Sequence, residues 1–230
     1  EGRGGHKRLH GVSIHMARRI RLASASSRRK KWLNGYFQES IEIEQKPLVG
    51  EEKSSDGEVS SQVADILDDK ISRASIQYFL EKQQSKQNNS ISPPEVWMVS
   101  DTLVEDPNDV CSALGQPDDE ISALRMLLDL SGCRHLVWSA TAIIQFTNNQ
   151  PIVNRFIESA VVEFQSLDEE SLKNLLSSES WKGKAGAYDL AGPAKSFSKL
   201  IEGDEVTVLG FANGAIKKLE KIIHSSELNS

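Results

Sequence analysis

The stretch 21–33 constrains this chain more than any other, because it joins three short segments of different character. Ile20 and Leu22 alternate with arginines, as in a short strand, and the small residues 23–27 follow as a tight loop. The basic run 28–31 then leads to two apolar residues, as at the start of a helix that packs on a core. A strand, a tight turn and a helix start point free backbone N–H groups into the turn. The stretch predicts an anion-binding cradle, and a basic, solvated helix end is the alternative.

Four polar side chains of this stretch suit a polyphosphate. Serine hydroxyls add hydrogen-bond donors, and arginine presents a planar fork that matches phosphate oxygens. We therefore expect a phosphate site formed by Ser24, Ser26, Arg28 and Arg29.

The charge of the chain is unevenly distributed. The formal net charge is −6 over 230 residues, yet up to Lys31 the only acidic residue is Glu1. A basic front could attract nucleic acid, but the acidic remainder argues against a dedicated nucleic-acid-binding protein. Salt-dependent DNA binding through residues 1–19 is kept as an alternative.

Several protein classes lack their sequence signals here. The two cysteines, Cys111 and Cys133, form no metal-binding spacing, so a structural zinc site is not expected. No apolar run approaches the roughly 18 residues of a membrane span. The glycine and serine motifs of P-loop, dinucleotide-binding and serine-hydrolase sites are also absent from the sequence.

Helical and strand patterns alternate along the chain, which predicts an α/β fold with a mixed, twisted sheet flanked by helices. After the cradle, a helix should end at Asn34-Gly35. We expect extended segments over 37–43, 96–99, 135–146, 156–164 and 205–209. We expect helices over 60–81, 117–132, 166–176, 193–201 and 213–224. One domain should span 18–224, with mobile loops at 45–60 and 82–95, a flexible tail at 1–17 and another at 225–230.

Three further places could carry chemistry. Asp101 ends an apolar strand, where α/β sheets present ligands, although such an aspartate can also be a cap or turn former. Glu42 and Glu44 share one face of a strand and could belong to the same site or form a solvated edge. The Gly/Ala-rich segment 182–188 could hold an anion with its backbone and lysines, or form a surface turn.

Two residues are expected to be structural on local pattern alone. Lys70 lies on the polar side of its helix and would face solvent. His135 lies in an apolar strand, which favours a core or edge histidine over a ligand.

Six segments occur together in one order: L-A-S-A-S-S-R-R at 22–29, S-D-T at 100–102, L-G-Q-P-D-D at 114–119, L-S-G at 130–132, K-A-G-A-Y at 184–188 and I-E-G-D at 201–204. In this set the chain resembles the Maf family of nucleoside triphosphate pyrophosphatases over about residues 18–224. The resemblance implies a fold like that of inosine triphosphatases, in a single two-lobed domain. It also implies hydrolysis of a nucleoside triphosphate to the monophosphate and pyrophosphate with a divalent metal, Mg²⁺ or Mn²⁺. A cytoplasmic homodimer that removes modified or surplus nucleotides, with no membrane partner, is further implied.

The resemblance assigns roles to individual residues. The general base of the family falls on Asp101, and its neighbouring specificity residue falls on Thr102. The phosphate-binding residues fall on Ser24, Arg28, Arg29, Lys70 and Lys184. The metal-binding acids fall on Glu42 and Glu44, together with Asp101.

The chain departs from the family pattern at two substrate-binding positions. Gln116 stands where a lysine is usual, which removes one positive charge from the phosphate site. Ala191 stands where a glutamine or glutamate helps to choose the base. We therefore expect a diverged member with a shifted substrate, and a catalytically weak nucleotide-binding relative with a regulatory role is the alternative.

Overall fold

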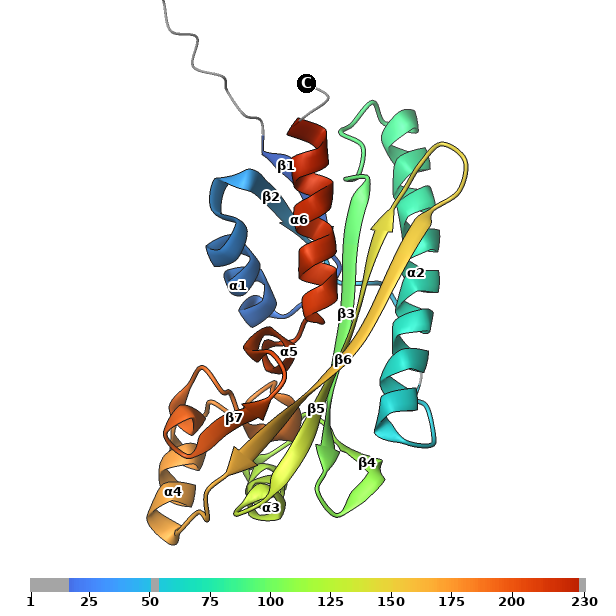
Figure 1. Cartoon of the computed structure of the whole chain (residues 1–230). Helices are drawn as coiled ribbons and strands as arrows, with labels where there is room; N and C mark the ends of the chain where they lie inside the picture. Colours follow the sequence, from blue (N-terminus) through green and yellow to red (C-terminus); the bar gives the residue numbers. More distant parts are fainter. Residues whose placement is uncertain (1–16, 51–53, 228–230) are drawn as a thin grey trace, which may run out of the picture.

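The computed structural model describes residues 17–50 and 54–227, and these are built around a mixed, seven-stranded sheet (Figure 1). Its strands are β1 (Arg18–Leu22), β2 (Ile41–Gln45), β3 (Val96–Asp106), β4 (Asp109–Leu114), β5 (Arg134–Gln145), β6 (Ile152–Phe164) and β7 (Ser198–Glu202). The order is β2-β1-β3-β5-β6-β7, with β4 paired to β3 outside this path. β1 runs parallel to β2 and β3, and the other pairs are antiparallel. The expected α/β class with a mixed sheet is confirmed.

Helices cover both faces of the sheet at the end that contains β1 and β2, and other helices pack together at the opposite end. They are α1 (Ser27–Phe37), α2 (Val59–Gln87), α3 (Glu120–Leu130), α4 (Glu169–Ser177), α5 (Glu205–Leu209) and α6 (Asn213–Glu227). α2 lies on one side of β3 and β5, whereas α1 and α6 lie on the other (Figure 1). α3, α4 and β7 form a second lobe, and the long strands β3, β5 and β6 run through both lobes. None of the described helices is both long and apolar enough to cross a lipid bilayer.

The apolar start of β3 is buried on both faces because successive side chains of a strand point in opposite directions. Trp97 and Val99 pack in the cluster under α2, and Val96 and Met98 pack in the cluster under α6. In the second lobe, a separate cluster joins residues of β5 and β6 to α3 and α4. The site-bearing strand is thus held from both sides.

The helix α2 is longer than expected. It begins at Val59 and continues to Gln87, so the prediction of a loop from residue 82 was wrong for 82–87. This polar end is rich in lysine and glutamine, which are good helix formers although they look like loop composition. At the other terminus, α6 continues to Glu227, three residues into the expected tail. The tail expected over 1–17 lies almost wholly outside the described residues.

The β1–β2 connection also differs from the prediction. α1 does not end at Asn34-Gly35 but continues to Phe37, whose ring is buried in the core, and a 3-10 turn precedes β2 at Ile41. The expected strand over 37–43 was therefore placed four residues too early. Burial of the Phe37 ring outweighs the tendency of glycine to end a helix.

Three other segments were assigned wrongly. Residues 105–115, where neither a helix nor a strand was expected, form the end of β3 and its hairpin with β4. The end of the helix expected over 193–201 belongs instead to β7, which spans 198–202 and pairs with β6. Residues 205–209, expected as extended, form α5, which ends at Gly210 in a left-handed conformation with φ 117°. Pairing with an existing edge strand decides the β7 segment, because tertiary context overrides local propensity.

Candidate active site

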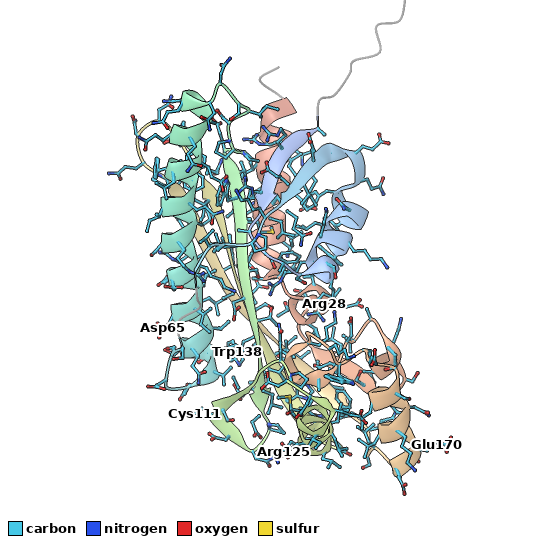
Figure 2. The ribbon with its side chains drawn as sticks, turned by 180° about the vertical axis from the view of Figure 1, so that it is seen from behind. Arg28, Asp65, Cys111, Arg125, Trp138 and Glu170 are labelled. Atoms are coloured by element: carbon cyan, nitrogen blue, oxygen red, sulfur yellow. The ribbon has the colours of Figure 1, made fainter. Side chains whose placement is uncertain are left out.

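A gap in the sheet creates the site. β1 pairs with β3 only as far as Met98, and pairing with β4 begins only at Val104. Along this edge, the described residues supply no neighbouring strand for residues 99–103. A cavity of about 710 Å³ opens there, between the β1–α1 loop, α2 and the segment 182–185. Viewed from behind, Arg28 lies where the two lobes meet (Figure 2).

The β1–α1 loop has the strand, turn and helix start on which the predicted cradle depends. Ser26 is the N-cap of α1, and its Oγ accepts a hydrogen bond from the backbone N–H of Arg29 at 3.3 Å. The Oγ of Ser24 accepts from the backbone N–H of Ser26 at 3.1 Å. The amide of Gln45 donates to the carbonyl oxygens of Ser24 and Ser26 at 2.9 and 3.2 Å, and so fixes the loop from β2. Residues 23–27 line the cavity, so the positive end of α1 faces it.

Asp101 and Lys70 form a buried ion pair at the β3 edge. Lys70 Nζ lies 2.6 Å from Asp101 Oδ1 and also donates to the Ser100 carbonyl oxygen at 3.3 Å. The two residues are only 9% and 8% exposed, and both line the cavity. The expectation that Lys70 faces solvent was wrong, because α2 packs this face against β3. Lys70, to which the resemblance assigns phosphate binding, lines the cavity beside Asp101.

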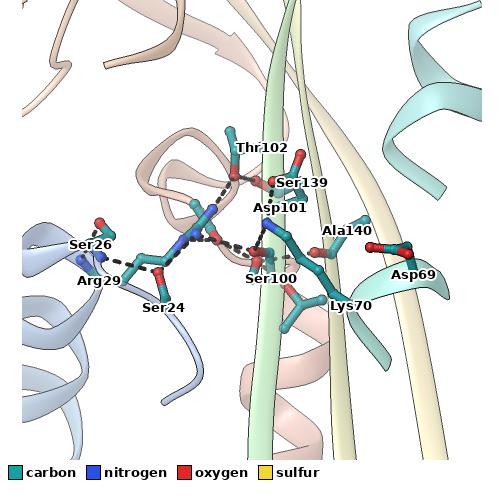
Figure 3. A network of polar contacts seen from close by, with 12 residues as sticks. Ser24, Ser26, Arg29, Asp69, Lys70, Ser100, Asp101, Thr102, Ser139 and Ala140 are labelled. Carbon is teal, nitrogen blue, oxygen red and sulfur yellow. Dashed lines mark hydrogen bonds and ion pairs between the residues drawn. The ribbon is translucent and has the colours of Figure 1, made fainter. Parts of the chain in front are cut away.

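Arg29 makes several contacts with the protein around the same edge. Its guanidinium donates to Ser24 Oγ, to the carbonyl oxygens of Ser100 and Gly210, and to Thr102 Oγ1 over 2.9–3.3 Å. Figure 3 shows Arg29 approaching β3 from the α1 side and Lys70 approaching it from the α2 side. The carboxylate of Asp101 is therefore held in a strand segment that is fixed from both sides.

The lining of the cavity is rich in cationic side chains. Among the described residues, the lining includes six lysines and arginines and one carboxylate, that of Asp101. The basic members are Arg28, Arg29, Lys70, Arg73, Lys182 and Lys184. Gln116 also lines the cavity and adds no charge. A space with this charge balance suits a polyanion.

Arg28 and Lys184 are tethered more loosely than Arg29. Each lies 3.6 Å from a carboxylate oxygen of Asp189, beyond normal hydrogen-bond distance. The Nε of Arg28 is buried and has no hydrogen-bond partner among the described residues. These cations therefore retain donor capacity for a ligand.

Ala191 lies next to this cavity rather than in it. It borders a second hollow of about 750 Å³, beside the stacked rings of Trp32 and Tyr36. Ser27 and Arg28 border both spaces, so the two are neighbours.

Glu42 and Glu44 do not line the cavity. Glu42 is exposed on β2, and the carboxylate of Glu44 pairs with Arg19 and Arg21. Among the described residues no three His, Cys, Asp or Glu side chains gather as a metal-binding group. The structure thus brings Asp101 to the cavity without the two glutamates.

His135 is a core residue, as expected from its strand. It is 3% exposed, and its Nε2 lies 2.9 Å from the hydroxyl of Tyr188. Burial lowers the pKa of His135 to about 4 and raises the pKa of Tyr188. This neutral pair anchors the segment that carries Lys184 and Asp189.

Three residues that support the site were not foreseen from the sequence. The side chain of Gln45 donates to backbone carbonyl oxygens, and Gly210 accepts through its own carbonyl oxygen. Such contacts leave no sequence motif. Arg73 lies one helical turn after Lys70, and its position in the cavity wall could have been found from that spacing.

The fold and site define an α/β protein with a cation-rich, carboxylate-bearing cavity at a sheet edge. Comparison with known families agrees: the model of the family "Maf-like protein" matches residues 19–221. The chain belongs to the Maf family.

Three curated relatives each carry the name dTTP/UTP pyrophosphatase. The protein from Pyrococcus abyssi is 30% identical over 88% of this chain and 95% of its own length. The protein from Pyrococcus horikoshii is 30% identical over 88% of this chain and 96% of its own length. That from Alkaliphilus oremlandii is 30% identical over 82% of this chain and 88% of its own length.

Proposed function

We propose that this protein hydrolyses nucleoside triphosphates, including modified or non-canonical ones, to the monophosphate and pyrophosphate. One observation carries the proposal: a single cavity unites the start of α1, six cationic side chains and the carboxylate of Asp101. The names of the relatives, dTTP/UTP pyrophosphatase, support the same reaction class.

The chemistry divides between a phosphate-binding part and a carboxylate. A water oxygen attacks the α-phosphorus, the bond from the α-phosphorus to the bridging oxygen breaks, and pyrophosphate leaves with the electron pair. Asp101 orients this water and accepts its proton. The backbone N–H groups of residues 24, 25 and 27, together with Arg28 and Lys184, stabilise the negative charge that grows on the leaving pyrophosphate. Lys70 fixes the carboxylate for this role.

The residues present fit a magnesium ion that is held mainly by substrate. Mg²⁺ usually binds one or two carboxylates together with phosphate oxygens and water. Asp101 can supply that carboxylate, because it lines the cavity and Lys70 contacts its Oδ1 atom rather than Oδ2. When bound, Mg²⁺ or Mn²⁺ would neutralise phosphate charge. The positions of Glu42 and Glu44 argue against their sharing the same ion.

The base of the nucleotide is proposed to reach the second hollow. Ala191 presents only a methyl group there, and Trp32 and Tyr36 offer ring surfaces that suit a planar base. Thr102, beside Asp101, is proposed to contact the nucleotide as well. A small side chain at Ala191 leaves room for a substituent on the base.

The proposal is tested with a panel of nucleotides. Purified protein with Mg²⁺ should release pyrophosphate from at least one of dTTP, UTP, CTP and methylated nucleoside triphosphates. Replacement of Asp101 by asparagine should lower kcat by about 10²- to 10⁴-fold, the usual contribution of a positioned base. Absence of turnover across the whole panel would refute the enzymatic proposal.

A second candidate is a nucleotide-binding protein with little catalysis and a regulatory role. It is favoured by the neutral Gln116 in the phosphate cavity and by Asp189 beside Arg28 and Lys184. This alternative predicts that triphosphates raise the melting temperature without being hydrolysed.

The assembly and location of the protein are further parts of the proposal. We propose a homodimer that acts in the cytoplasm on free nucleotides, without a dedicated nucleic-acid partner. Analytical ultracentrifugation tests the dimer. Loss of steeply salt-dependent DNA binding on removal of residues 1–19 would instead support the nucleic-acid alternative.

A further inference from the structure

The two adjacent arginines at the start of α1 have different surroundings. An arginine carries five N–H donors. Arg29 directs its Nε, Nη1 and Nη2 atoms to four neutral protein oxygens. Arg28, by contrast, has a buried Nε without a hydrogen-bond partner among the described residues and a single ion-pair contact at 3.6 Å.

The acceptors of Arg29 lie on three separate segments. Ser24 belongs to the β1–α1 loop, Ser100 and Thr102 belong to β3, and Gly210 ends α5. One guanidinium therefore fastens the start of α1 to the β3 edge and to the α5–α6 connection (Figure 3).

The Ser100 carbonyl oxygen is an acceptor that a neighbouring strand would normally use. The carbonyl oxygen of Met98 accepts from the backbone N–H of Ala23, the last ladder contact on this edge. Two residues later, the Ser100 carbonyl points to the same side, because strand groups alternate. It accepts instead from Arg29 Nη1 at 3.2 Å and Lys70 Nζ at 3.3 Å. The two side chains replace the missing strand at the residue before Asp101.

The hydroxyl of Thr102 extends the contact on the other side of Asp101. Thr102 Oγ1 lies 2.9 Å from Arg29 Nη2 and 2.8 Å from Ser139 Oγ. Ser139 in turn donates to the carbonyl oxygen of Thr207 in α5 at 2.7 Å. Both neighbours of Asp101 are thus tied to Arg29.

Gly210 is shaped around the same guanidinium. A Cβ added there would lie 2.7 Å from Arg29 Nε, and the backbone φ of 117° already disfavours other residues. Substitution at Gly210 would therefore displace Arg29 without removing any charge from the cavity.

We infer that Arg29 is a positioning residue that fixes Asp101 through Ser100 and Thr102, and that phosphate binding falls to Arg28 rather than Arg29. This inference rests on the proposed hydrolysis and assigns a role within it. The geometry uses the donors of Arg29 on protein oxygens and leaves those of Arg28 for the ligand.

Three variants separate the two roles: Arg29→Lys, Gly210→Ala and, as the matched control, Arg28→Lys. Turnover is measured on the best nucleotide of the panel. Affinity is measured by calorimetry with an analogue carrying a methylene bridge between the α- and β-phosphorus. Because lysine keeps a point charge but loses the guanidinium fork, Arg29→Lys should lower kcat about tenfold or more, with the Kd for the analogue changed less than about threefold. Gly210→Ala should do the same, whereas Arg28→Lys should act mainly on Kd.

A double variant adds a coupling test. Once Arg29→Lys has removed Nε, the methyl group of Gly210→Ala has less to displace, so the two losses in kcat should be clearly less than additive. Circular dichroism reports whether each variant folds, and Arg29→Lys carries the test alone if Gly210→Ala does not fold.

Two results would overturn the inference: a tenfold or greater rise in Kd for Arg29→Lys with kcat unchanged, or full kcat and unchanged Kd in that variant. Failure of the proposed function is recognised separately, because wild-type protein would then show no turnover. Even in that case the analogue decides about Arg29: unchanged affinity of Arg29→Lys supports its assignment away from phosphate, and a tenfold loss contradicts it.

Discussion

The two walls of the cavity are built differently. On the inner wall, Lys70 pairs with Asp101 at 2.6 Å, and Arg29 and Lys70 donate to the residues on either side of it at 2.9–3.3 Å. On the outer wall, the polar contacts of the Arg28 and Lys184 side chains with the described residues are those with Asp189, at 3.6 Å. Hydrogen bonds depend steeply on distance and angle, whereas the attraction between charges falls only gradually with distance. A carboxylate that aims a water needs the first kind of support, and cations that gather phosphates can act with the second.

The strongest test of the inner wall removes the partner of Asp101. In Lys70→Gln the carboxylate stays buried without its ammonium, so the free energy of unfolding should fall by about 3 kcal/mol. Urea denaturation measures this change. The double variant Lys70→Gln/Asp101→Asn should recover part of the loss, because no uncompensated charge remains. Equal stability of wild type and Lys70→Gln would show that water, rather than the lysine, stabilises the negative charge of the Asp101 carboxylate.

The stability contributed by His135, which anchors the segment of Lys184 and Asp189, should depend on pH. Because the pKa of His135 is lowered to about 4, the folded protein favours the neutral ring. Its contribution to stability is complete above the unfolded pKa near 6.5 and is lost as the pH falls from about 6.5 towards 4, by on the order of 2–3 kcal/mol. Urea denaturation of wild type and His135→Gln across this range isolates the effect as the difference between the two curves. Parallel curves would contradict the assigned burial effect.

Removal of one outer cation should weaken binding without disturbing the inner wall. In Arg28→Gln we expect the analogue to bind about tenfold to a hundredfold more weakly, since hydrogen bonds to charged groups contribute about 1.5–3 kcal/mol. The slope of affinity against salt should also decrease. Calorimetry at several salt concentrations measures both, with Lys199→Gln on β7 as a control of equal charge change. A similar loss in the control would indicate a general field effect rather than a contact.

The cap of α1 allows a smaller test of the cradle. Ser26→Ala removes the acceptor for the Arg29 N–H and should lower the free energy of unfolding by about 1 kcal/mol. Ser27→Ala, one residue later, is the matched control and should change it by less than half as much, since Ser27 is not the N-cap. Thermal unfolding compares the pair. Equal effects would mean that the Ser26 hydroxyl does not cap the helix.

Features built from contiguous residues could be predicted from the sequence, whereas features decided by distant segments could not. The strand, loop and helix start at 18–37 were predictable because the residues that form them are contiguous, and the resemblance predicted that Asp101 and Lys70 belong to one site. The β3 hairpin, β7 and α5 were misread, because each is decided by pairing or packing with segments distant in sequence. Gln45 and Gly210 were missed for the same reason. Their roles are backbone contacts across 19–181 positions, which no local pattern encodes.

The smallest expected effect concerns the acid that tethers the outer wall. Asp189 lies near Arg28 and Lys184 but forms no close hydrogen bond with either, so its influence on them is electrostatic. In Asp189→Asn the side-chain oxygen can still accept from the Ala191 N–H, which preserves the local turn. Loss of the negative charge should strengthen analogue binding about two- to fivefold, the scale of a partly screened ion pair.

Glu163→Gln on β6 also removes one negative charge, and Glu163 is not among the residues that line the cavity. It therefore provides the control for this variant in calorimetry. If Asp189→Asn binds the analogue more tightly than both wild type and the control, the carboxylate competes with phosphate for the two cations. If it binds more weakly, Asp189 instead holds Arg28 and Lys184 where the phosphates need them, and the outer wall is positioned by the same principle as the inner one.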